Sequence, residues 1–156
     1  MKGIFPERPI VAVGALILKN NKILLVKRKN HPDKGKWSIP GGAVRVGESL
    51  KEAIAREVKE ECGIDVGKGK IAAIIDKIYF TTEGKVIFHY SIVDFLFGDF
   101  SGKPHAGSDA ESVELFPINN VPKCSNVAIS VKELLKNLGE NEMPVYTVYK
   151  EKYNEK

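Results

Sequence analysis

The chain has 156 residues, of which 43% are hydrophobic and 28% charged, and its 24 basic and 20 acidic side chains give a formal net charge of +4. So many apolar residues exclude a disordered chain, and this length suffices for a hydrophobic core without disulfide support. No apolar run is long enough to cross a membrane, the first nine residues form no apolar signal core, and the two cysteines form no CxxC motif. We therefore expect one cytoplasmic domain over residues 1–156.

The first predicted elements form a β-hairpin. Ile10–Leu18 and Lys22–Arg28 are apolar runs rich in β-branched residues, and the Asn20-Asn21 pair between them favours a tight turn. The next segment, Asn30–Gly42, is rich in Pro, Gly and Lys and is predicted to be a loop.

The second half of the chain is predicted to contain three strands and a helix. The strands are Lys70–Phe80, Val86–Phe97 and Ser112–Ile118. Apolar residues from Val127 to Leu138 recur at helical spacing, and Gly139 is expected to stop this helix. With the helix described next, the pattern predicts an α/β or α+β fold with a mixed sheet.

The segment between the two groups of strands concentrates acidic residues, because five of the fourteen glutamates lie between Glu48 and Glu61. Ser49 and Glu52 have the spacing of a capping box, which predicts a helix that begins near Leu50. Gly63 is placed to end this helix.

Helical geometry places three glutamates beside an apolar stripe. The stripe and the small residue at its edge are Ile54, Val58, Cys62 and Ala55. At about 100° per residue, Glu57, Glu60 and Glu61 share an arc of roughly 100° next to it. Carboxylates gathered in this way repel one another and suit a divalent cation such as Mg²⁺, whereas a solvated acidic surface is the alternative.

The spacing of these residues is specific. From Gly42 to Ile64 the chain fits the pattern G-x5-E-x7-R-E-U-x-E-E-x-G-U, in which U is a bulky aliphatic residue. Chance would match all nine specified positions less than about once in 10⁸ starting positions. A Gly35-x-Trp37-x-x-Pro40-Gly41-Gly42 segment leads into the pattern. On these residues the chain resembles the Nudix hydrolases, over about residues 10–138.

This resemblance implies an α/β/α sandwich in which a mixed central sheet lies between helices and the motif forms a loop–helix–loop. It also implies hydrolysis, dependent on Mg²⁺ or Mn²⁺, of a nucleoside diphosphate linked to another moiety. Water attacks a phosphorus atom of the pyrophosphate in this reaction, and metal ions stabilise the charge that develops.

The resemblance further assigns roles to individual residues. The expected metal ligands and catalytic carboxylates are Glu57, Glu60 and Glu61, with the backbone carbonyl of Gly41 as a further ligand. The expected structural support of the site comes from Gly42 and from a salt bridge between Glu48 and Arg56. The general base is expected to be either Glu57 or an acidic residue before the strand at Ser112, where Asp109 and Glu111 match and Glu111 is favoured.

The remaining substrate contacts follow from residue chemistry and have structural alternatives. Arg28 and Arg45, with Lys27 and Lys29, are candidates to bind phosphate, although basic strand ends are also common on solvated surfaces. Four aromatic residues flank the turn at Thr82–Gly84 and are candidates to stack on a nucleobase: Tyr79, Phe80, Phe88 and Tyr90. Aromatic residues are also ordinary strand formers.

The substrate is left open among several classes. ADP-ribose or a related nucleoside diphosphate sugar ranks first, because the loop Gly98–Asp109 and the following Ala110-Glu111 resemble ADP-ribose pyrophosphatases. A proline often found about 15 residues after the motif in that subgroup is replaced by Tyr79. Sanitation of the (d)NTP pool ranks second and dinucleoside polyphosphate hydrolysis third. A non-catalytic nucleotide-binding regulatory module is the alternative from another class.

The expected partner is a small-molecule nucleotide. Basic residues are scattered, so neither nucleic acid nor a membrane is expected to bind. Many Nudix proteins are dimers, and the aromatic run Val145–Tyr149 could add or swap a strand, so a homodimer is a further expectation.

Overall fold

The computed structural model describes residues 3–31, 33–107 and 110–154. Its centre is a mixed sheet with strand order β10-β6-β7-β1-β2-β3, in which β4 also pairs with β1 and β9 with β2. The strands of this sheet are β1 (Ile10–Lys19), β2 (Lys22–Arg28), β3 (Trp37–Ser38), β4 (Gly41–Ala43), β6 (Lys70–Phe80), β7 (Val86–Phe97), β9 (Ala110–Pro117) and β10 (Val145–Lys152). A second sheet pairs β5 (Asp65–Val66) with β8 (Phe100–Ser101).

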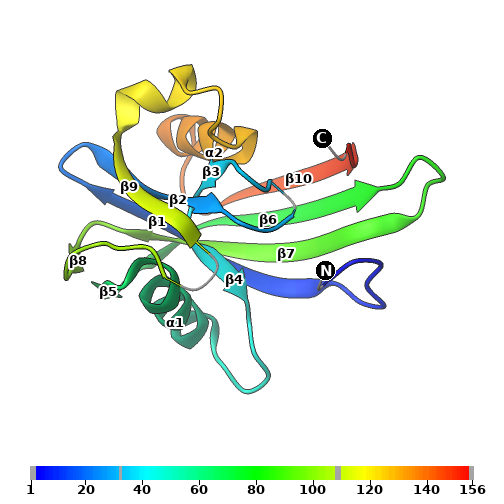
Figure 1. The fold of residues 1–156 in the computed structure, drawn as a ribbon, viewed down its shortest axis with the longest axis horizontal. Helices are drawn as coiled ribbons and strands as arrows, with labels where there is room; N and C mark the ends of the chain where they lie inside the picture. The colour runs from blue at the N-terminus through cyan, green and yellow to red at the C-terminus, as the bar shows by residue number, and fades with distance from the viewer. Residues whose placement is uncertain (1–2, 32, 108–109, 155–156) are drawn as a thin grey trace.

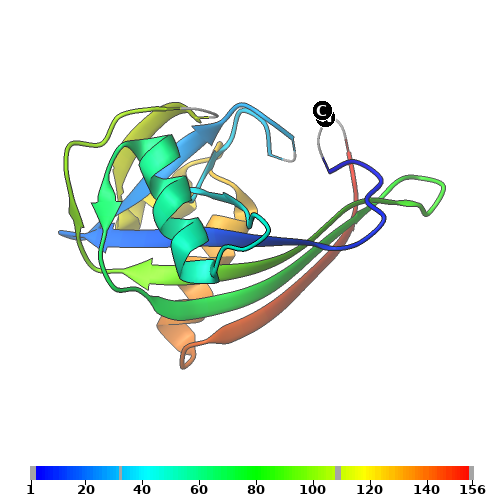
Figure 2. The ribbon, with the colours of Figure 1, turned by 90° about the horizontal axis from the view of Figure 1, so that it is seen from below.

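Two α-helices lie on opposite sides of the central sheet, as Figures 1 and 2 show. They are α1 (Leu50–Cys62) and α2 (Ile129–Glu140), and a 3-10 helix, η1 (Ile118–Lys123), precedes α2. This arrangement confirms the predicted mixed α/β fold. None of the helices in the described part of the chain is long and apolar enough to span a membrane.

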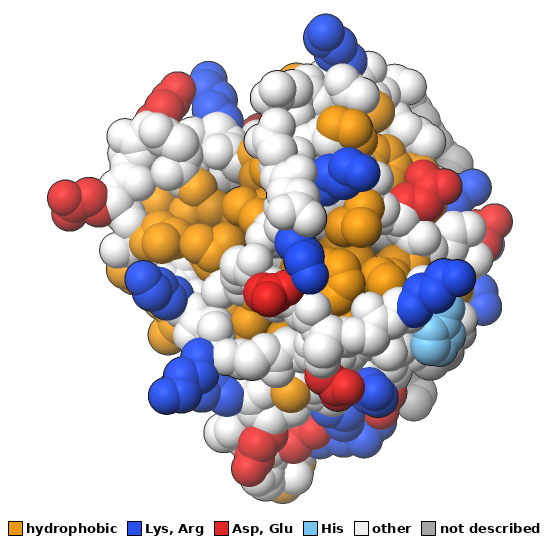
Figure 3. Space-filling model, turned by 90° about the vertical axis from the view of Figure 1, so that its left-hand side faces the viewer, with side chains coloured by type: hydrophobic (Ala, Val, Ile, Leu, Met, Phe, Trp, Pro, Cys, Tyr) orange, Lys and Arg blue, Asp and Glu red, His pale blue; other side chains and the backbone are white. Residues whose placement is uncertain are grey.

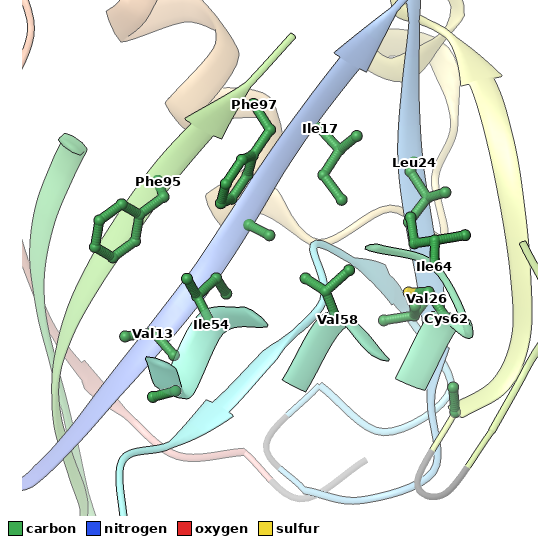
Figure 4. Packing of buried hydrophobic residues seen from close by; sticks show 13 residues of the cluster. Val13, Ile17, Leu24, Val26, Ile54, Val58, Cys62, Ile64, Phe95 and Phe97 are labelled. Atoms are coloured by element: carbon green, nitrogen blue, oxygen red, sulfur yellow. The ribbon is translucent and has the colours of Figure 1, made fainter. Parts of the chain in front are cut away.

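Each helix covers its own hydrophobic cluster. On the α1 side, Ile54 and Val58 pack against side chains of β1, β2 and β7 (Figure 4). On the α2 side, Val131 and Leu134 pack against Ile75 and other residues of the sheet. The sheet is therefore buried on both faces near its centre. The packing of α1 on one face fixes its position relative to β1 and β4.

The first hairpin forms as predicted. Asn20 and Asn21 adopt φ values of 52° and 60°, so both lie in the left-handed region that a type I′ turn requires. Strand β1 pairs antiparallel with β2 on one side and parallel with β7 on the other.

Several predicted boundaries are wrong. Strand β9 begins at Ala110 rather than Ser112. Helix α2 begins at Ile129 and continues through Gly139 to Glu140, because a glycine in an exposed last turn costs only about 1 kcal/mol. Val127 lies before α2 and forms a bridge with Trp37. The predicted loop Asn30–Gly42 also contains β3 and the start of β4.

The aromatic tail, for which the sequence indicates no definite role, forms an edge strand of the chain's own sheet. β10 pairs parallel with β6, from Val145 opposite Ala73 to Lys152 opposite Phe80. The Tyr149 hydroxyl donates to Glu133 on α2, and the Tyr153 hydroxyl lies 2.7 Å from Nδ1 of His31. The tail therefore joins α2 to the loop between β2 and β3.

Candidate active site

Helix α1 is fixed at both ends. The Ser49 hydroxyl accepts a hydrogen bond from the Glu52 backbone N–H at 3.1 Å, and the Glu52 carboxylate accepts one from the Ser49 N–H at 2.8 Å. Gly63 ends the helix with φ of 70°. The backbone N–H groups of His105 and Gly107 then donate to the carbonyls of Cys62 and Glu61. The capping box and the helix end are therefore confirmed.

The packing of α1 determines which residues face the interior. Ile54, Val58 and Cys62 are buried as predicted. Ala55, predicted at the edge of the stripe, is exposed, and Ala53, which was not predicted to belong to it, is buried. With this face against the sheet, the helix presents Glu57 and Glu61 toward β4.

Two glycines let β4 approach these carboxylates. The Gly41 N–H donates to Oε2 of Glu61 at 3.1 Å, and Glu61 is only 8% exposed. A Cβ atom at Gly42 would lie 2.4–2.7 Å from the carboxylate atoms of Glu57, which is closer than Cβ atoms approach other heavy atoms. A Cβ at Gly41 would meet the Val13 carbonyl oxygen at 2.1 Å. Gly41 is therefore a steric requirement of the site, and a larger residue at Gly42 would displace the Glu57 carboxylate.

Arg56 connects three of the motif's glutamates. Its guanidinium donates two hydrogen bonds to Glu48, one to Glu57 at 2.7 Å and one to Glu60 at 3.3 Å, and it also binds the Ala43 carbonyl at 3.1 Å. The bond to Arg56 lowers the pKa of Glu48 to about 2, and the same carboxylates raise the pKa of Arg56. The structure therefore contains the ion pair between Glu48 and Arg56 that the resemblance implies.

The three carboxylates that are expected to bind metal form ion pairs or hydrogen bonds with other residues of the chain. Glu57 and Glu60 contact Arg56, Glu60 also lies 3.5 Å from Arg45, and Glu61 accepts from Gly41. Within residues 3–31, 33–107 and 110–154, no three Asp, Glu, His or Cys side chains are grouped as a metal site. The donor set nevertheless consists of hard oxygen atoms beside a glycine cradle with no room for a Cβ, which fits Mg²⁺ or Mn²⁺.

A cavity of about 490 Å³ adjoins these residues. Predicted site residues that line it are Arg28, Lys29, Gly41, Gly42, Arg45, Arg56, Glu57 and Glu61, whereas Glu48 and Glu60 are not among its lining residues. Its walls come from β1, β6, β7, α1, α2, the start of β9 and the chain from β2 through the loop after β4. The volume is within the range of small-molecule sites.

Three charged residues that line this cavity were not predicted from the sequence: Asp33, Lys77 and Asp94. Asp94, on β7, is 2% exposed, and burial raises the pKa of its carboxyl to about 7 although Lys77 acts in the opposite direction. Lys77, on β6, lies 3.3 Å from the Ser130 hydroxyl and 4.0 Å from Asp33, and burial lowers its pKa. The signal available in the sequence was charged residues inside two long apolar strands: Asp94 in Val86–Phe97, and Lys77, next to Asp76, in Lys70–Phe80.

Other predicted contacts lie elsewhere. Glu111 is exposed, 3.7 Å from Lys27, and is not among the described residues that line the cavity. Asp109 lies outside the described residues. Tyr79 and Phe80 also fall outside the cavity lining, because they end β6 where the β6–β7 hairpin projects beyond the helices (Figure 2).

The placement of the aromatic residues is therefore different from the one expected for base stacking. Tyr79 packs edge-on against Phe88 and Tyr153, with ring centroids 6.2 and 6.0 Å away. Tyr90 is the member of the aromatic group that lines the cavity.

We predict that Asp94→Asn changes how stability depends on pH. The folded-state pKa of Asp94, about 7, lies above the ordinary value of 3.8. The folded protein therefore binds this proton more tightly, and Asp94 lowers the free energy of unfolding progressively as the pH rises from about 4 to about 7. The melting temperature of the variant minus that of the wild type should increase by several degrees between pH 5 and pH 8. A difference that is constant with pH would contradict this.

Comparisons with known proteins agree with the geometry. The family model described as NUDIX domain matches residues 8–138. A curated relative from Methanocaldococcus jannaschii, named ADP-ribose pyrophosphatase, is 41% identical over 115 residues, which are 74% of this chain and 66% of that protein. The chain thus spans less than two thirds of the length of the first curated relatives that it matches.

Solved structures share the fold. A MutT NUDIX hydrolase from Burkholderia pseudomallei has a TM-score of 0.71 and 29% identity, covering 83% of this chain and 98% of that one. A bifunctional NMN adenylyltransferase/ADP ribose pyrophosphatase from Francisella tularensis, complexed with AMP and a manganese ion, has a TM-score of 0.62 and 26% identity. The similarity covers 85% of this chain and 42% of that one.

Proposed function

Because the chain belongs to the Nudix family, we propose that it is a pyrophosphohydrolase, dependent on Mg²⁺ or Mn²⁺, whose substrate is ADP-ribose or a related nucleoside diphosphate sugar. The observation that carries this proposal is the cavity of about 490 Å³ lined by both Glu57 and Glu61 and by the basic residues Arg28 and Arg45. Such a cavity offers carboxylates for a cation and positive charge for the substrate's phosphates. The 41% identity to the Methanocaldococcus ADP-ribose pyrophosphatase supports this choice of substrate.

The carboxylates of Glu57, Glu60 and Glu61 would hold the cation, together with the Gly41 carbonyl. Bound there, Mg²⁺ or Mn²⁺ would polarise the pyrophosphate and offset the charge that develops on it. Gly41 and Gly42 contribute by letting β4 lie directly against the Glu61 and Glu57 carboxylates. All of these groups come from α1 and β4.

The chain's own residues perform the remaining steps. Glu57 lines the cavity and is the better placed base to take the proton of the attacking water, whereas Glu111 is exposed beside Lys27. Arg28 and Arg45 would bind the phosphates. Glu48 and Arg56 are positioning residues, because they tie α1 to the segment between β4 and α1.

A substrate panel tests this proposal. Purified protein with Mg²⁺ is incubated with ADP-ribose, ADP-glucose, dNTPs and diadenosine polyphosphates, and the products are separated by chromatography. We expect AMP and ribose 5-phosphate from ADP-ribose, with kcat/KM at least about tenfold above every other substrate class, and no turnover in EDTA. A monophosphate and pyrophosphate from dNTPs as the main reaction would favour nucleotide-pool sanitation instead.

Two other outcomes of the substrate panel would favour a different function. Preferred cleavage of diadenosine polyphosphates would support the third-ranked substrate class. Tight nucleotide binding with no hydrolysis of any compound would support a regulatory module. Either result would contradict the proposed function.

A small-molecule nucleotide remains the proposed partner, and the proposed location is the cytoplasm. On the face of the molecule in Figure 3, Lys and Arg side chains are dispersed among acidic and apolar ones rather than gathered in one patch. On this face, the dispersion agrees with a small-molecule partner rather than nucleic acid. β10 pairs with β6 of the same chain, so the aromatic run adds an edge strand to the chain's own sheet. The homodimer stays a prediction.

A further inference from the structure

The cavity extends well beyond the glutamates of α1, and its inner part has a different character. Four aliphatic side chains line it there: Ile75, Ile92, Val131 and Leu134. Asp94 and Lys77 also line it, from two neighbouring strands of the same sheet. The proposed phosphate chemistry uses neither of these charged residues.

The position of Asp94 is built into the sheet. Gly14 on β1 pairs with Asp94 on β7 and with Gly41 on β4. A Cβ at Gly14 would lie 2.1 Å from Oδ1 of Asp94, so only glycine leaves room for the carboxyl at this place. Two strand spacings separate Gly41 from Asp94, a backbone distance of about 10 Å. This is a suitable separation for the phosphate and base ends of one nucleotide.

The chemistry of this inner part suits a nucleobase. A phosphate would meet the carboxylates of Asp94 and Asp33, which outnumber the Lys77 ammonium, whereas flat apolar rings match the aliphatic walls. The Asp94 carboxyl can accept a hydrogen bond from an amino group, and the Lys77 ammonium can donate one to a ring nitrogen. Adenine presents such an amino group beside a ring nitrogen, whereas hypoxanthine has a carbonyl oxygen in place of the amino group.

We propose that Asp94 and Lys77 form a base-recognition subsite that selects a purine with a 6-amino group over one with a 6-keto group. This subsite rests on the proposed function only in that the ligand is a nucleotide. Asp94 acts by accepting from the amino group, Lys77 by donating to the adjacent ring nitrogen, and Gly14 by leaving space for the carboxyl. The subsite would give the enzyme its preference for adenine nucleotides.

AMP and IMP provide the direct test, because they differ only in the 6-amino or 6-keto group and the associated ring proton. Isothermal titration calorimetry without metal, at pH 8 so that Asp94 with its pKa of about 7 is ionised, measures the binding of each to the wild type, to Asp94→Asn and to Asp76→Asn. Asp76 is a matched control, since it lies on β6 outside the cavity lining and binds Ser91 and Tyr146.

We expect the wild type and Asp76→Asn to bind AMP about tenfold to a hundredfold more tightly than IMP. Asp94→Asn should bring the two affinities within about threefold, because the asparagine amide can also donate to a keto oxygen. Equal binding of AMP and IMP by the wild type, or an unchanged ratio in Asp94→Asn, would overturn the proposal.

A second variant keeps the test decisive if Asp94→Asn does not fold. Lys77→Met should weaken AMP binding about tenfold, and unchanged AMP affinity would overturn the role of this subsite. Hydrolysis of ADP-ribose is measured separately with the wild type. A wild type that hydrolyses ADP-ribose but binds AMP and IMP equally would refute the subsite alone. A wild type that prefers AMP but hydrolyses no ADP-ribose would refute the proposed function alone.

Discussion

Replacing Glu61 with glutamine should lower the turnover of ADP-ribose about a thousandfold or more and leave the fold intact. The Glu61 carboxylate is nearly buried and accepts from the Gly41 N–H at 3.1 Å. A glutamine side-chain oxygen can keep this hydrogen bond, so the packing of β4 on α1 is retained. The substitution removes the negative charge that a divalent cation requires.

Glu57→Gln should lower turnover by a similar factor, because it also removes a negative charge from the cation site. The fold should again be kept, because the glutamine oxygen can still accept from Arg56. The measurements are kcat at saturating Mg²⁺ and the circular dichroism spectrum. Glu114→Gln, at an exposed position of β9, is the matched control and should keep full turnover. Near-normal turnover in both Glu57→Gln and Glu61→Gln would refute the assignment of the metal site.

Arg56→Leu should reduce the free energy of unfolding by about 2–4 kcal/mol, which is somewhat less than the loss of a fully buried ion pair. The Arg56 side chain is only 16% exposed, and its guanidinium neutralises Glu48 and Glu57, which are 18% and 14% exposed. Leucine would leave these carboxylates close together without a counter-charge, and it would leave the Ala43 carbonyl without its donor.

Urea denaturation measures this loss, and Mg²⁺ provides a further check. The cation should restore part of the lost stability in Arg56→Leu, because it supplies positive charge to the same carboxylates. Arg8→Leu, at an exposed position near the start of the chain, should change the free energy of unfolding by no more than about 0.5 kcal/mol. A similarly small change in the free energy of unfolding of Arg56→Leu would show that the guanidinium does not stabilise the packing of α1 on the segment from Ala43 to Glu48.

The features that could be predicted from the sequence depend on short-range interactions. The Asn20-Asn21 turn requires only two residues in the left-handed region, and the capping box of Ser49 and Glu52 is complete within four residues. The arc of glutamates follows from helical periodicity. The motif spacing then identifies the family, because each specified residue has a steric or ionic role near α1.

The features that were missed depend on long-range pairing. Asp94 and Lys77 enter the cavity only because β6, β7 and β1 are adjacent in the sheet and α2 covers the same face. Tyr79 was assigned to the substrate from its residue type, although the β6–β7 hairpin carries it beyond the cavity lining and against Tyr153. Strand periodicity identifies neither the neighbouring strand nor the extent to which a helix covers it.

The most direct test of the central proposal is the hydrolysis of ADP-ribose in ¹⁸O-labelled water with Mg²⁺, followed by ³¹P NMR and mass spectrometry. We predict that AMP and ribose 5-phosphate form in equal amounts, that ¹⁸O appears in one of the two products, and that EDTA or Glu61→Gln abolishes the reaction. Persistence of intact ADP-ribose under conditions in which the folded wild type has Mg²⁺ available would contradict the proposed function.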